Sequence, residues 1–366
     1  MKQYNNWASV SGGNMVALYV TSVEAAGKTA LCAGIGRHLL SQGIKVGFIA
    51  PVQLSEISGS DGHKDAAFIK EAFELRESTK VLCPIRLSRQ DLWQSLTDGV
   101  ADFTPRLKQA YARISRGKDI VLMEGLSDLG VDNVSTLACY TISETLDARV
   151  IIVLRCSATL DPSGIAQVGR KLEKRLLGVV VNSVPESRTE AMKQDVAVSF
   201  QKAGVRILGV LPEVRSLRGV SVQEAAQVLG GEIVTCADNT DEIIESVMLG
   251  AMTLDSGIEY FSRKANKAAV IRGERADMQL AALETSTKCL ILTGESKVSA
   301  AVVRQAEDKR VPIMLVKQDT PGAIAGIEEA LARASFRSPQ KLQTFESILG
   351  GHFDFKALYS ELGLEA

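Results

Sequence analysis

The clearest chemical signal in the chain is the run Ser22-Val23-Glu24-Ala25-Ala26-Gly27-Lys28-Thr29. An apolar run, residues 16–20, precedes it, and a helix-like segment, residues 29–40, follows it. This order of strand, loop, Gly-Lys-Thr and helix is the setting that a phosphate-binding P-loop requires. Backbone N–H groups and the helix dipole at a helix start favour an anion. We therefore expect Lys28 to reach the terminal phosphates of a nucleotide and the Thr29 hydroxyl to bind Mg²⁺.

The loop departs from the P-loop pattern G-x-x-x-x-G-K-[ST] at its first position, which is Ser22. Serine fits there if its backbone keeps a negative φ, so we keep Ser22, Ala25, Ala26 and Gly27 as candidate nucleotide-binding residues. The alternative is an ordinary helix start that carries Gly-Lys-Thr by chance.

Two acidic residues are candidate metal ligands beside Thr29. Asp65 opens a predicted helix, residues 65–75, after a loop rich in glycine and serine, and Glu124 ends a predicted strand, residues 119–123. Ligands of parallel sheets bind at the carboxyl ends of the strands. Thr29, Asp65 and Glu124 together can hold Mg²⁺ with phosphates and water. The alternatives are a helix N-cap for Asp65 and a solvated loop acid for Glu124.

Three residues further along the chain are candidates for the nucleotide base. Asn182 ends an apolar run and has a side-chain amide that can recognise a purine edge. Pro212 and Glu213 follow the next run and can flank the base. The alternative for Asn182 is a turn residue before Pro185.

The elements around these residues indicate an α/β fold with a doubly wound parallel sheet, because continuous apolar runs alternate with helical spacing. The predicted strands are residues 15–20, 45–50, 119–123, 149–154, 177–182 and 206–211. The predicted helices include residues 65–75, 107–115, 165–175 and 190–203.

A second, smaller α/β domain is expected after residue 236. We divide the chain into a flexible N-terminus (1–14), a P-loop domain (15–236), a smaller domain (237–335) and a helical tail (336–366). In the smaller domain we predict strands at 268–271, 289–292 and 313–316 and helices at 241–249, 277–284 and 299–308. The tail is rich in apolar residues, which indicates a docked helix or a dimer contact. We expect its basic residues, Arg337 and Lys341, together with Arg333 just before it, to form a solvated face.

The composition and residue spacing exclude several classes of protein function. Lys+Arg number 42 and Asp+Glu 43, so charge gives no case for nucleic acid as a partner. No apolar run approaches the roughly 18 residues that span a bilayer, and residues 1–14 lack the apolar segment of a signal peptide. The 6 cysteines form no Cys-x-x-Cys pair, and we expect reduced thiols and a cytoplasmic protein. The sequence shows no nucleophilic triad and no zinc spacing.

Residues 15–236 resemble the dethiobiotin synthetase branch of P-loop proteins, which also includes cobyrinic acid a,c-diamide synthase. The residues that carry the resemblance are Gly27-Lys28-Thr29, Val46-Gly47-Phe48, Asp65-Ala66, Glu124-Gly125, Val181-Asn182 and Gly209-Val210-Leu211-Pro212-Glu213. The smaller domain, residues 237–335, is similar to a DRTGG domain, through Val270-Ile271-Arg272-Gly273 and Leu290-Ile291-Leu292-Thr293-Gly294. The pair of domains resembles the N-terminal region of long bacterial phosphotransacetylases.

The departures from these families narrow the function. The synthetases carry a lysine before Pro-Val that holds the substrate, and here Ala50 stands at that position. Long phosphotransacetylases carry a further catalytic domain, and about 30 residues follow the DRTGG-like domain here. The resemblance therefore implies retained nucleotide machinery without the known substrate machinery. We expect neither dethiobiotin synthesis nor complete phosphate acetyltransferase activity from this chain.

Three hypotheses remain. The first is a regulatory or accessory protein that binds MgATP, forms a homodimer through the DRTGG-like domain or tail, and serves a partner in acetate or CoA metabolism. The second is a MgATP-dependent ligase or ATPase with a different substrate. The third is an interaction protein whose P-loop no longer works.

Overall fold

The computed structural model describes residues 15–55, 61–98, 102–130, 133–156, 162–250, 257–294 and 297–364 of the chain. The predicted flexible N-terminus, residues 1–14, lies outside the described residues. The chain divides into two units, one formed by residues up to Glu213 together with Arg337 onward and the other by Val214–Phe336. None of the helices in the described ranges is long and apolar enough to cross a membrane.

The first unit is built on a parallel sheet of six strands in the order β2-β5-β1-β6-β7-β8, which confirms the doubly wound α/β fold. In the middle of the sheet the side chains on both faces are apolar, and Leu18, Leu122 and Ile152 have no exposed surface. The strands are β1 (Val16–Ser22), β2 (Val46–Ile49), β5 (Ile120–Glu124), β6 (Arg149–Arg155), β7 (Leu176–Val184) and β8 (Ile207–Pro212).

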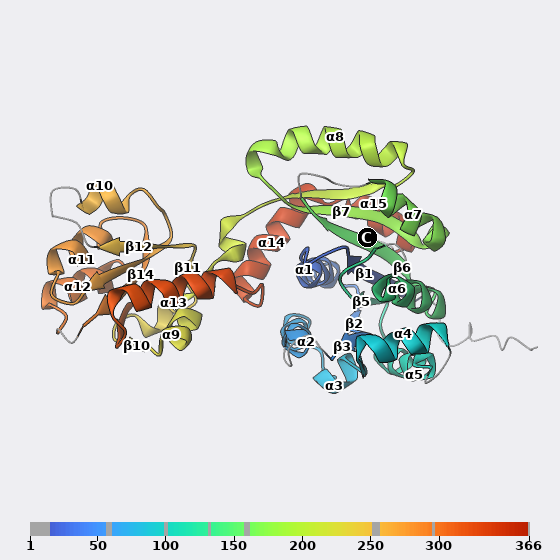
Figure 1. Ribbon diagram of the computed structural model, residues 1–366, viewed down its shortest axis with the longest axis horizontal. Coiled ribbons are helices and arrows are strands. Elements are labelled where there is room, and N and C mark those ends of the chain that lie inside the picture. The colour runs from blue at the N-terminus through green and yellow to red at the C-terminus, as the bar shows by residue number, and fades with distance from the viewer. Residues whose placement is uncertain are drawn as a thin grey trace, which may run out of the picture. The chain divides into compact units, whose positions relative to one another are not determined.

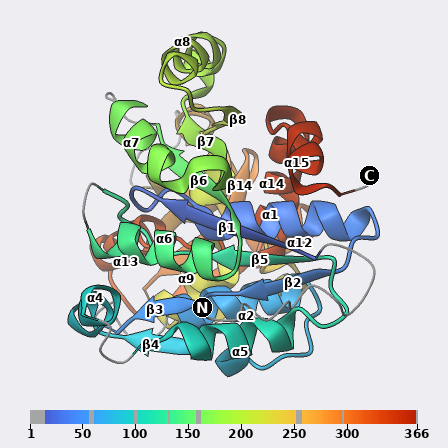
Figure 2. The ribbon, with the colours of Figure 1, turned by 90° about the vertical axis from the view of Figure 1, so that its right-hand side faces the viewer.

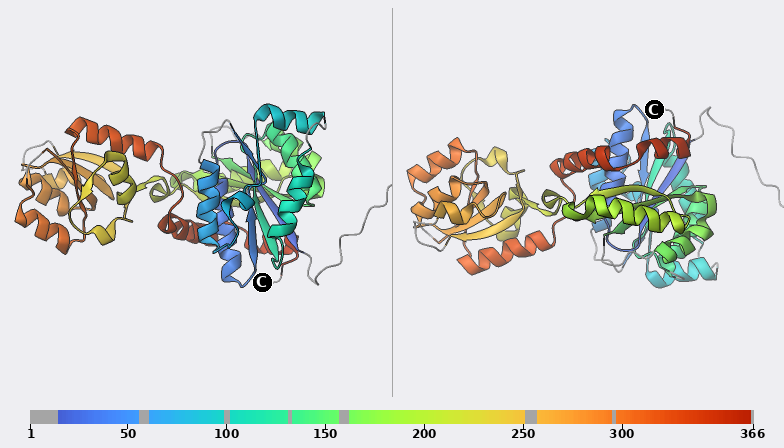
Figure 3. Two further views of the ribbon diagram at one scale, coloured as in Figure 1. Left: turned by 90° about the horizontal axis from the view of Figure 1, so that it is seen from below. Right: turned by 90° about the horizontal axis from the view of Figure 1, so that it is seen from above.

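Helices cover both faces of this sheet. The helix α1 (Lys28–Ser41) lies with α2 (Asp61–Ala72) and α14 (Pro339–His352) on one face, and α5 (Thr104–Ile114), α6 (Val134–Thr145) and α7 (Pro162–Leu172) lie on the other (Figures 2 and 3). The remaining elements of the unit are β3 (Val52–Leu54), α3 (Thr79–Leu82), β4 (Ile85–Leu87), α4 (Arg89–Thr97), α8 (Thr189–Lys202) and α15 (Phe355–Leu362).

The C-terminal segment, residues 337–364, folds onto the first unit as the helices α14 and α15 (Figure 1). Between the two helices, the Asp354 N–H donates to the Leu208 carbonyl at 2.7 Å, and Phe353 forms an antiparallel bridge with Gly209 of β8. The approach is close, because a Cβ on Gly209 would lie 2.8 Å from the His352 carbonyl oxygen. The edge strand β8 is therefore covered by the end of the chain, which protects its unpaired backbone groups.

The second unit holds a sheet of five strands in the order β10-β15-β14-β13-β12, with only β10 antiparallel. Residues 214–236, placed with the P-loop domain in the sequence analysis, fold here, since β10 pairs with β15. The elements of this unit are β9 (Val220–Ser221), α9 (Val222–Leu229), β10 (Glu232–Ile233), β11 (Ile243–Ile244), β12 (Ser246–Gly250), α10 (Gly257–Phe261), β13 (Lys267–Arg272), α11 (Ala276–Leu283), β14 (Thr287–Thr293), α12 (Ala300–Asp308), β15 (Ile313–Val316) and α13 (Thr320–Ala332).

One predicted element of the second unit is wrong. Residues 241–249 were expected to form a helix, but they form the strands β11 and β12. The β12 strand pairs in parallel with β13, with Val247 opposite Ala268. A short apolar run fits a helix or a buried strand by its periodicity alone, so pairing with a neighbouring strand decided the outcome.

Candidate functional site: a phosphate loop at the carboxyl edge of the sheet

The loop between β1 and α1 is tied down by a side chain from a distant strand. Gly27 precedes α1 with φ +90°, a left-handed conformation that favours glycine. The amide of Asn182, two residues before the end of β7, donates to the Ala26 carbonyl at 2.9 Å. A Cβ on Gly27 would lie 2.7 Å from the same amide nitrogen. Glycine is therefore required here both by the backbone conformation and by the close approach of Asn182.

Ser22, which stands where the P-loop pattern has glycine, fits its position. It is absent from the residues with positive φ, so a side chain costs no backbone strain there. Its hydroxyl donates to the Glu24 carbonyl at 2.5 Å, inside the loop. Its own carbonyl accepts from the Leu129 N–H at 3.0 Å. Ser22 thus holds the loop shape by side-chain bonding.

The two residues that open α1 point to groups at the end of β5. The Thr29 hydroxyl donates to Glu124 Oε1 at 2.6 Å. Lys28 Nζ donates to the Ser127 hydroxyl at 2.5 Å, and the lysine is only 9 % exposed. Glu124 lies opposite Val20 in the β1–β5 register, so both strands deliver their carboxyl ends to the same place. A cation, a hydroxyl and a carboxylate therefore meet at the start of α1.

Burial makes the Glu124 carboxyl group unusually basic. Desolvation is the largest cause and, together with the charge of Asp65, raises the pKa of Glu124 from 4.5 to about 7. The charges of Lys28 and Arg337 and the hydrogen bond from Thr29 lower the pKa, but they do not outweigh burial. An acid in such a place is stabilised as a carboxylate when a cation binds beside it.

Asp65 lies one turn inside α2, because the helix begins at Asp61 and not at Asp65 as predicted. Its Oδ1 accepts a hydrogen bond from Arg337 Nε at 2.8 Å, in a pair whose side chains are 26 % and 22 % exposed. The predicted solvated face of basic residues is therefore wrong for Arg337, and also for Lys341, which is 1 % exposed. Only Arg333, 80 % exposed, fits that prediction. Arg337 thus contacts one of the candidate metal ligands, and the spacing of residues in the sequence gives no signal for this contact.

The candidate base-contacting residues are placed at the same sheet edge. Asn182 uses its amide on the loop, and its Oδ1 accepts from the Ser183 N–H at 2.8 Å. Pro212 ends β8, and the Glu213 N–H donates to the Val184 carbonyl at 2.7 Å. The structure thus brings Asn182 to the phosphate loop and places Pro212 and Glu213 against β7.

The residues present fit a magnesium ion that is shared with phosphates. No cluster of three or more His, Cys, Asp or Glu suited to a metal occurs in the described ranges. Mg²⁺ in nucleotide sites is held by one or two carboxylates, phosphates and water, and does not need a protein cage. Thr29, Glu124 and Asp65 match that donor set, and the observation that favours a cation is the 2.6 Å contact between the Thr29 hydroxyl and Glu124 Oε1.

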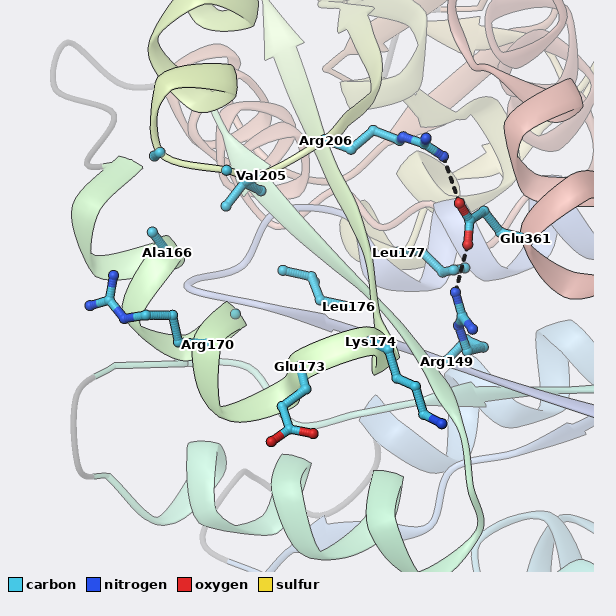
Figure 4. A pocket seen from close by; sticks show the side chains of 13 residues that line it. Arg149, Ala166, Arg170, Glu173, Lys174, Leu176, Leu177, Val205, Arg206 and Glu361 are labelled. Atoms are coloured by element: carbon cyan, nitrogen blue, oxygen red, sulfur yellow. Dashed lines mark hydrogen bonds and ion pairs between the residues drawn. The ribbon is translucent and has the colours of Figure 1, made fainter.

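A cavity of about 540 Å³ lies at the other edge of the sheet (Figure 4). Its lining includes Arg149, which begins β6, and Arg206, which precedes β8. Both arginines bond Glu361 of α15, at 2.7 Å and 2.9 Å. The cavity is thus at the amino ends of the strands, and Glu361 there anchors the C-terminal segment.

The fold and the loop define a P-loop protein, in which a parallel sheet presents Gly-Lys-Thr at the start of a helix. The sequence profile of the AAA domain family AAA_26 matches residues 16–221, more than half of the chain, and the chain belongs to this family. The DRTGG domain profile matches residues 224–330.

Among curated proteins, the chain is similar to phosphate acetyltransferases. It is 20 % identical to that of Pseudomonas putida over 360 residues, which cover 92 % of this chain and 50 % of the relative. The chain thus spans about half the length of the phosphate acetyltransferases it matches, namely their N-terminal half. It is also 23 % identical to the ATP-dependent dethiobiotin synthetase of Methanococcus vannielii, over 53 % of this chain and 92 % of the relative. Both resemblances expected from the sequence are confirmed.

Two solved structures show partial similarity. The CBS and DRTGG domains of the regulatory region of Clostridium perfringens pyrophosphatase, complexed with diadenosine tetraphosphate, align with TM-score 0.27 and 20 % identity over 31 % of this chain and 47 % of that one. Chloroplast FtsY from Physcomitrella patens aligns with TM-score 0.32 and 15 % identity over 55 % of this chain and 60 % of that one.

Proposed function

We propose that this chain is a nucleotide-binding regulatory or accessory protein that holds MgATP at the loop between β1 and α1. The observation that carries the proposal is the contact of the Thr29 hydroxyl with the half-buried Glu124 carboxylate, beside Lys28. A hydroxyl and a carboxylate at this distance are arranged to bind one hard cation together. The lysine supplies the positive charge that a terminal phosphate needs.

Different residues of the site would bind the phosphates and the magnesium ion. The backbone of Ala25, Ala26 and Gly27 carries the N–H groups that cradle phosphates in such loops, and Asn182 positions that backbone. Lys28 would exchange its bond to Ser127 for a phosphate oxygen, and Thr29, Glu124 and Asp65 would hold Mg²⁺. The ion would neutralise phosphate charge.

A regulatory or accessory role is supported by what accompanies the nucleotide site. The DRTGG domain follows the P-loop domain in the same chain, as in the N-terminal half of phosphate acetyltransferases. The position of the substrate lysine of the related synthetases is Ala50, which is 7 % exposed and has no charge to offer a substrate. We propose further that the chain forms a homodimer and supports a partner in acetate or CoA metabolism, as the resemblance to phosphate acetyltransferases implies. All 6 cysteines are free, which fits a reducing cytoplasm.

The deciding experiment measures nucleotide binding and ADP release in the same samples, for the wild type, Lys28→Ala and Lys108→Ala. Lys108 is an exposed lysine on α5 and serves as the matched control. We expect tight binding of MgATP without turnover, weakened about 10- to 100-fold by Lys28→Ala, since a charge-assisted hydrogen bond is worth roughly 1.5–3 kcal/mol.

The other outcomes select the other hypotheses. ADP release above that of Lys28→Ala would favour an ATPase or a ligase with an unknown carboxylate substrate. Absence of binding to ATP, ADP and GTP would refute the proposal and leave an interaction protein whose P-loop does not function.

A further inference from the structure

The C-terminal segment reaches the phosphate site from the far end of the sequence. Arg337 begins this segment, directly after the second unit ends at Phe336. Its Nε donates to Asp65 across 272 positions of the chain. The segment is then held along α1 by α14 (Figures 1 and 2), where Arg37 bonds Glu346 at 3.2 Å. Arg337 is therefore held in place by a docked helix that follows it.

This docking is tight and apolar as well as ionic. A Cβ on Gly34 of α1 would lie 2.4 Å from Leu349 and 3.0 Å from Phe345, so the absence of a side chain lets α14 sit against α1. Phe345 and Leu349 are 2 % and 1 % exposed. The His38 ring stacks on Phe355 with centroids 3.6 Å apart. The helix that begins with the phosphate-loop lysine thus carries the C-terminal segment on its side.

Arg337 adds a second positive charge to the site. Its charge acts on Glu124 and lowers the pKa of that carboxyl, as the charge of Lys28 does. Lys28 and Arg337 therefore approach the two carboxylates from different elements, α1 and the C-terminal segment. Two carboxylates and two cationic side chains balance one another in charge, so the site can accept an anion together with a divalent cation.

The guanidinium group has the geometry that a phosphate needs. Its parallel N–H donors match two oxygens of a carboxylate or of a phosphoryl group, which an ammonium cannot do. Asp65 is one of the candidate magnesium ligands, and its Oδ1 cannot serve the guanidinium and a divalent cation equally well. A terminal phosphoryl group offers Arg337 replacement oxygens at the same site.

We propose that Arg337 is a specificity-determining residue of the nucleotide site, which pairs with Asp65 in the nucleotide-free protein and bonds the terminal phosphoryl group of a bound nucleoside triphosphate. This inference rests on the proposed function, because it requires a nucleotide at the loop. It gives the site a preference for triphosphate over diphosphate. The residue that distinguishes the two nucleotides is then Arg337, the first residue after the second unit.

The test is calorimetric binding of MgATP and MgADP to the wild type, Arg337→Ala, Arg337→Lys and Glu346→Ala. Glu346→Ala is the matched control, because it removes an ion pair between α14 and α1 without touching Asp65. We expect Arg337→Ala to weaken MgATP about 10- to 100-fold and MgADP less than about 3-fold. Arg337→Lys should recover only part of the MgATP affinity, since lysine keeps the positive charge but lacks the two parallel N–H donors of the guanidinium. Circular dichroism and the melting temperature of each nucleotide-free variant check folding.

The outcomes separate this inference from the proposed function. Equal losses for both nucleotides, no loss, or tighter binding of both by Arg337→Ala would each overturn the contact with the terminal phosphate; tighter binding would mark Arg337 as a competitor of the cation for Asp65. An equal effect of Glu346→Ala would assign the change to docking of α14 and overturn the inference. If the wild type binds neither nucleotide, the proposed function fails and this inference fails with it.

Discussion

The Thr29 hydroxyl lies 2.6 Å from Glu124 Oε1, so the first turn of α1 and the end of β5 are joined at the point where the phosphate loop ends. The two residues are 95 positions apart in the chain. The β1–β5 pairing brings them together, because Glu124 lies opposite Val20, two residues before the end of β1. Glu124 also carries a raised pKa, so the protein should respond to pH through this residue.

Glu124 should make the nucleotide-free protein less stable as pH rises. Its pKa is raised by burial from 4.5 to about 7, so between these values the folded protein binds more protons than the unfolded chain. The free energy of unfolding therefore falls through this window, by about 3 kcal/mol for a shift of this size. Urea unfolding from about pH 5 to about pH 8 measures the fall, and Glu124→Gln should remove this component. A wild type and variant with the same pH profile would contradict the prediction.

Binding of MgATP should show the opposite dependence on pH. A carboxylate binds the cation and a neutral carboxyl does not, so protonated Glu124 must lose its proton first. We expect the affinity for MgATP to rise as pH increases through the raised pKa of Glu124, which is about 7, and to level off at higher pH. The Glu124→Gln variant keeps an acceptor oxygen for the Thr29 hydroxyl but should bind MgATP weakly at every pH. Titrations with ATP and EDTA in place of Mg²⁺ are the control, and a pH-independent wild-type affinity would refute the role of Glu124.

Gly27→Ala should abolish nucleotide binding, whereas Gly43→Ala should not. Both glycines have positive φ, +90° and +80°, so either substitution costs roughly 1 kcal/mol of backbone strain. At Gly27 the new Cβ would also displace the Asn182 amide, 2.7 Å away, while nothing lies within 4 Å of a Cβ on Gly43. Urea unfolding and nucleotide titration of both variants measure the difference. Equal nucleotide affinities would show that Asn182 does not hold the loop.

Docking of α14 on α1 should depend on Gly34. Gly34→Ala places a methyl group where Leu349 and Phe345 now lie, and overpacking of this kind costs about 1–3 kcal/mol. Gly350→Ala is the matched control in α14, since nothing lies within 4 Å of its Cβ and alanine favours a helix by roughly 0.5–1 kcal/mol. Hydrogen exchange of residues 339–352 should speed up in Gly34→Ala alone. Unchanged exchange in both variants would show that this contact does not secure the helix.

Lys267 in the second unit should give a stability change of its own in alkaline solution. It has no exposed surface, its Nζ donates to Thr285 Oγ1 at 2.8 Å, and burial lowers its pKa from 10.5 to about 8. The unfolded chain binds more protons between these values, so stability rises from about pH 8 to about pH 10. Lys267→Met should flatten this rise in urea unfolding followed at the second unit. A rise that persists in the variant would assign it to another group.

The local pattern of the chain determined the class of fold and the position of the phosphate loop. Apolar β-branched runs followed by helical spacing define strand-loop-helix units, and Gly27-Lys28-Thr29 marks the loop, because these signals lie within a few residues of one another. Residues that end parallel strands, such as Glu124 and Asn182, could be placed at the same edge by topology alone. Their contacts with Thr29 and with Ala26 follow from strand order, which the sequence does not state.

Tertiary packing alone decided two further features, namely the strands at residues 241–249 and the position of Arg337. Residues 241–249 form strands because β13 offers a pairing edge, although their local spacing also suits a helix. Arg337 was expected in solvent and instead bonds Asp65, 272 positions away, since a docked helix fixes its place. Long-range contacts of this kind depend on the shapes of surfaces that exist only once the sheet has formed. The sequence by itself therefore located the phosphate loop, and the folded chain supplied the second cation beside it.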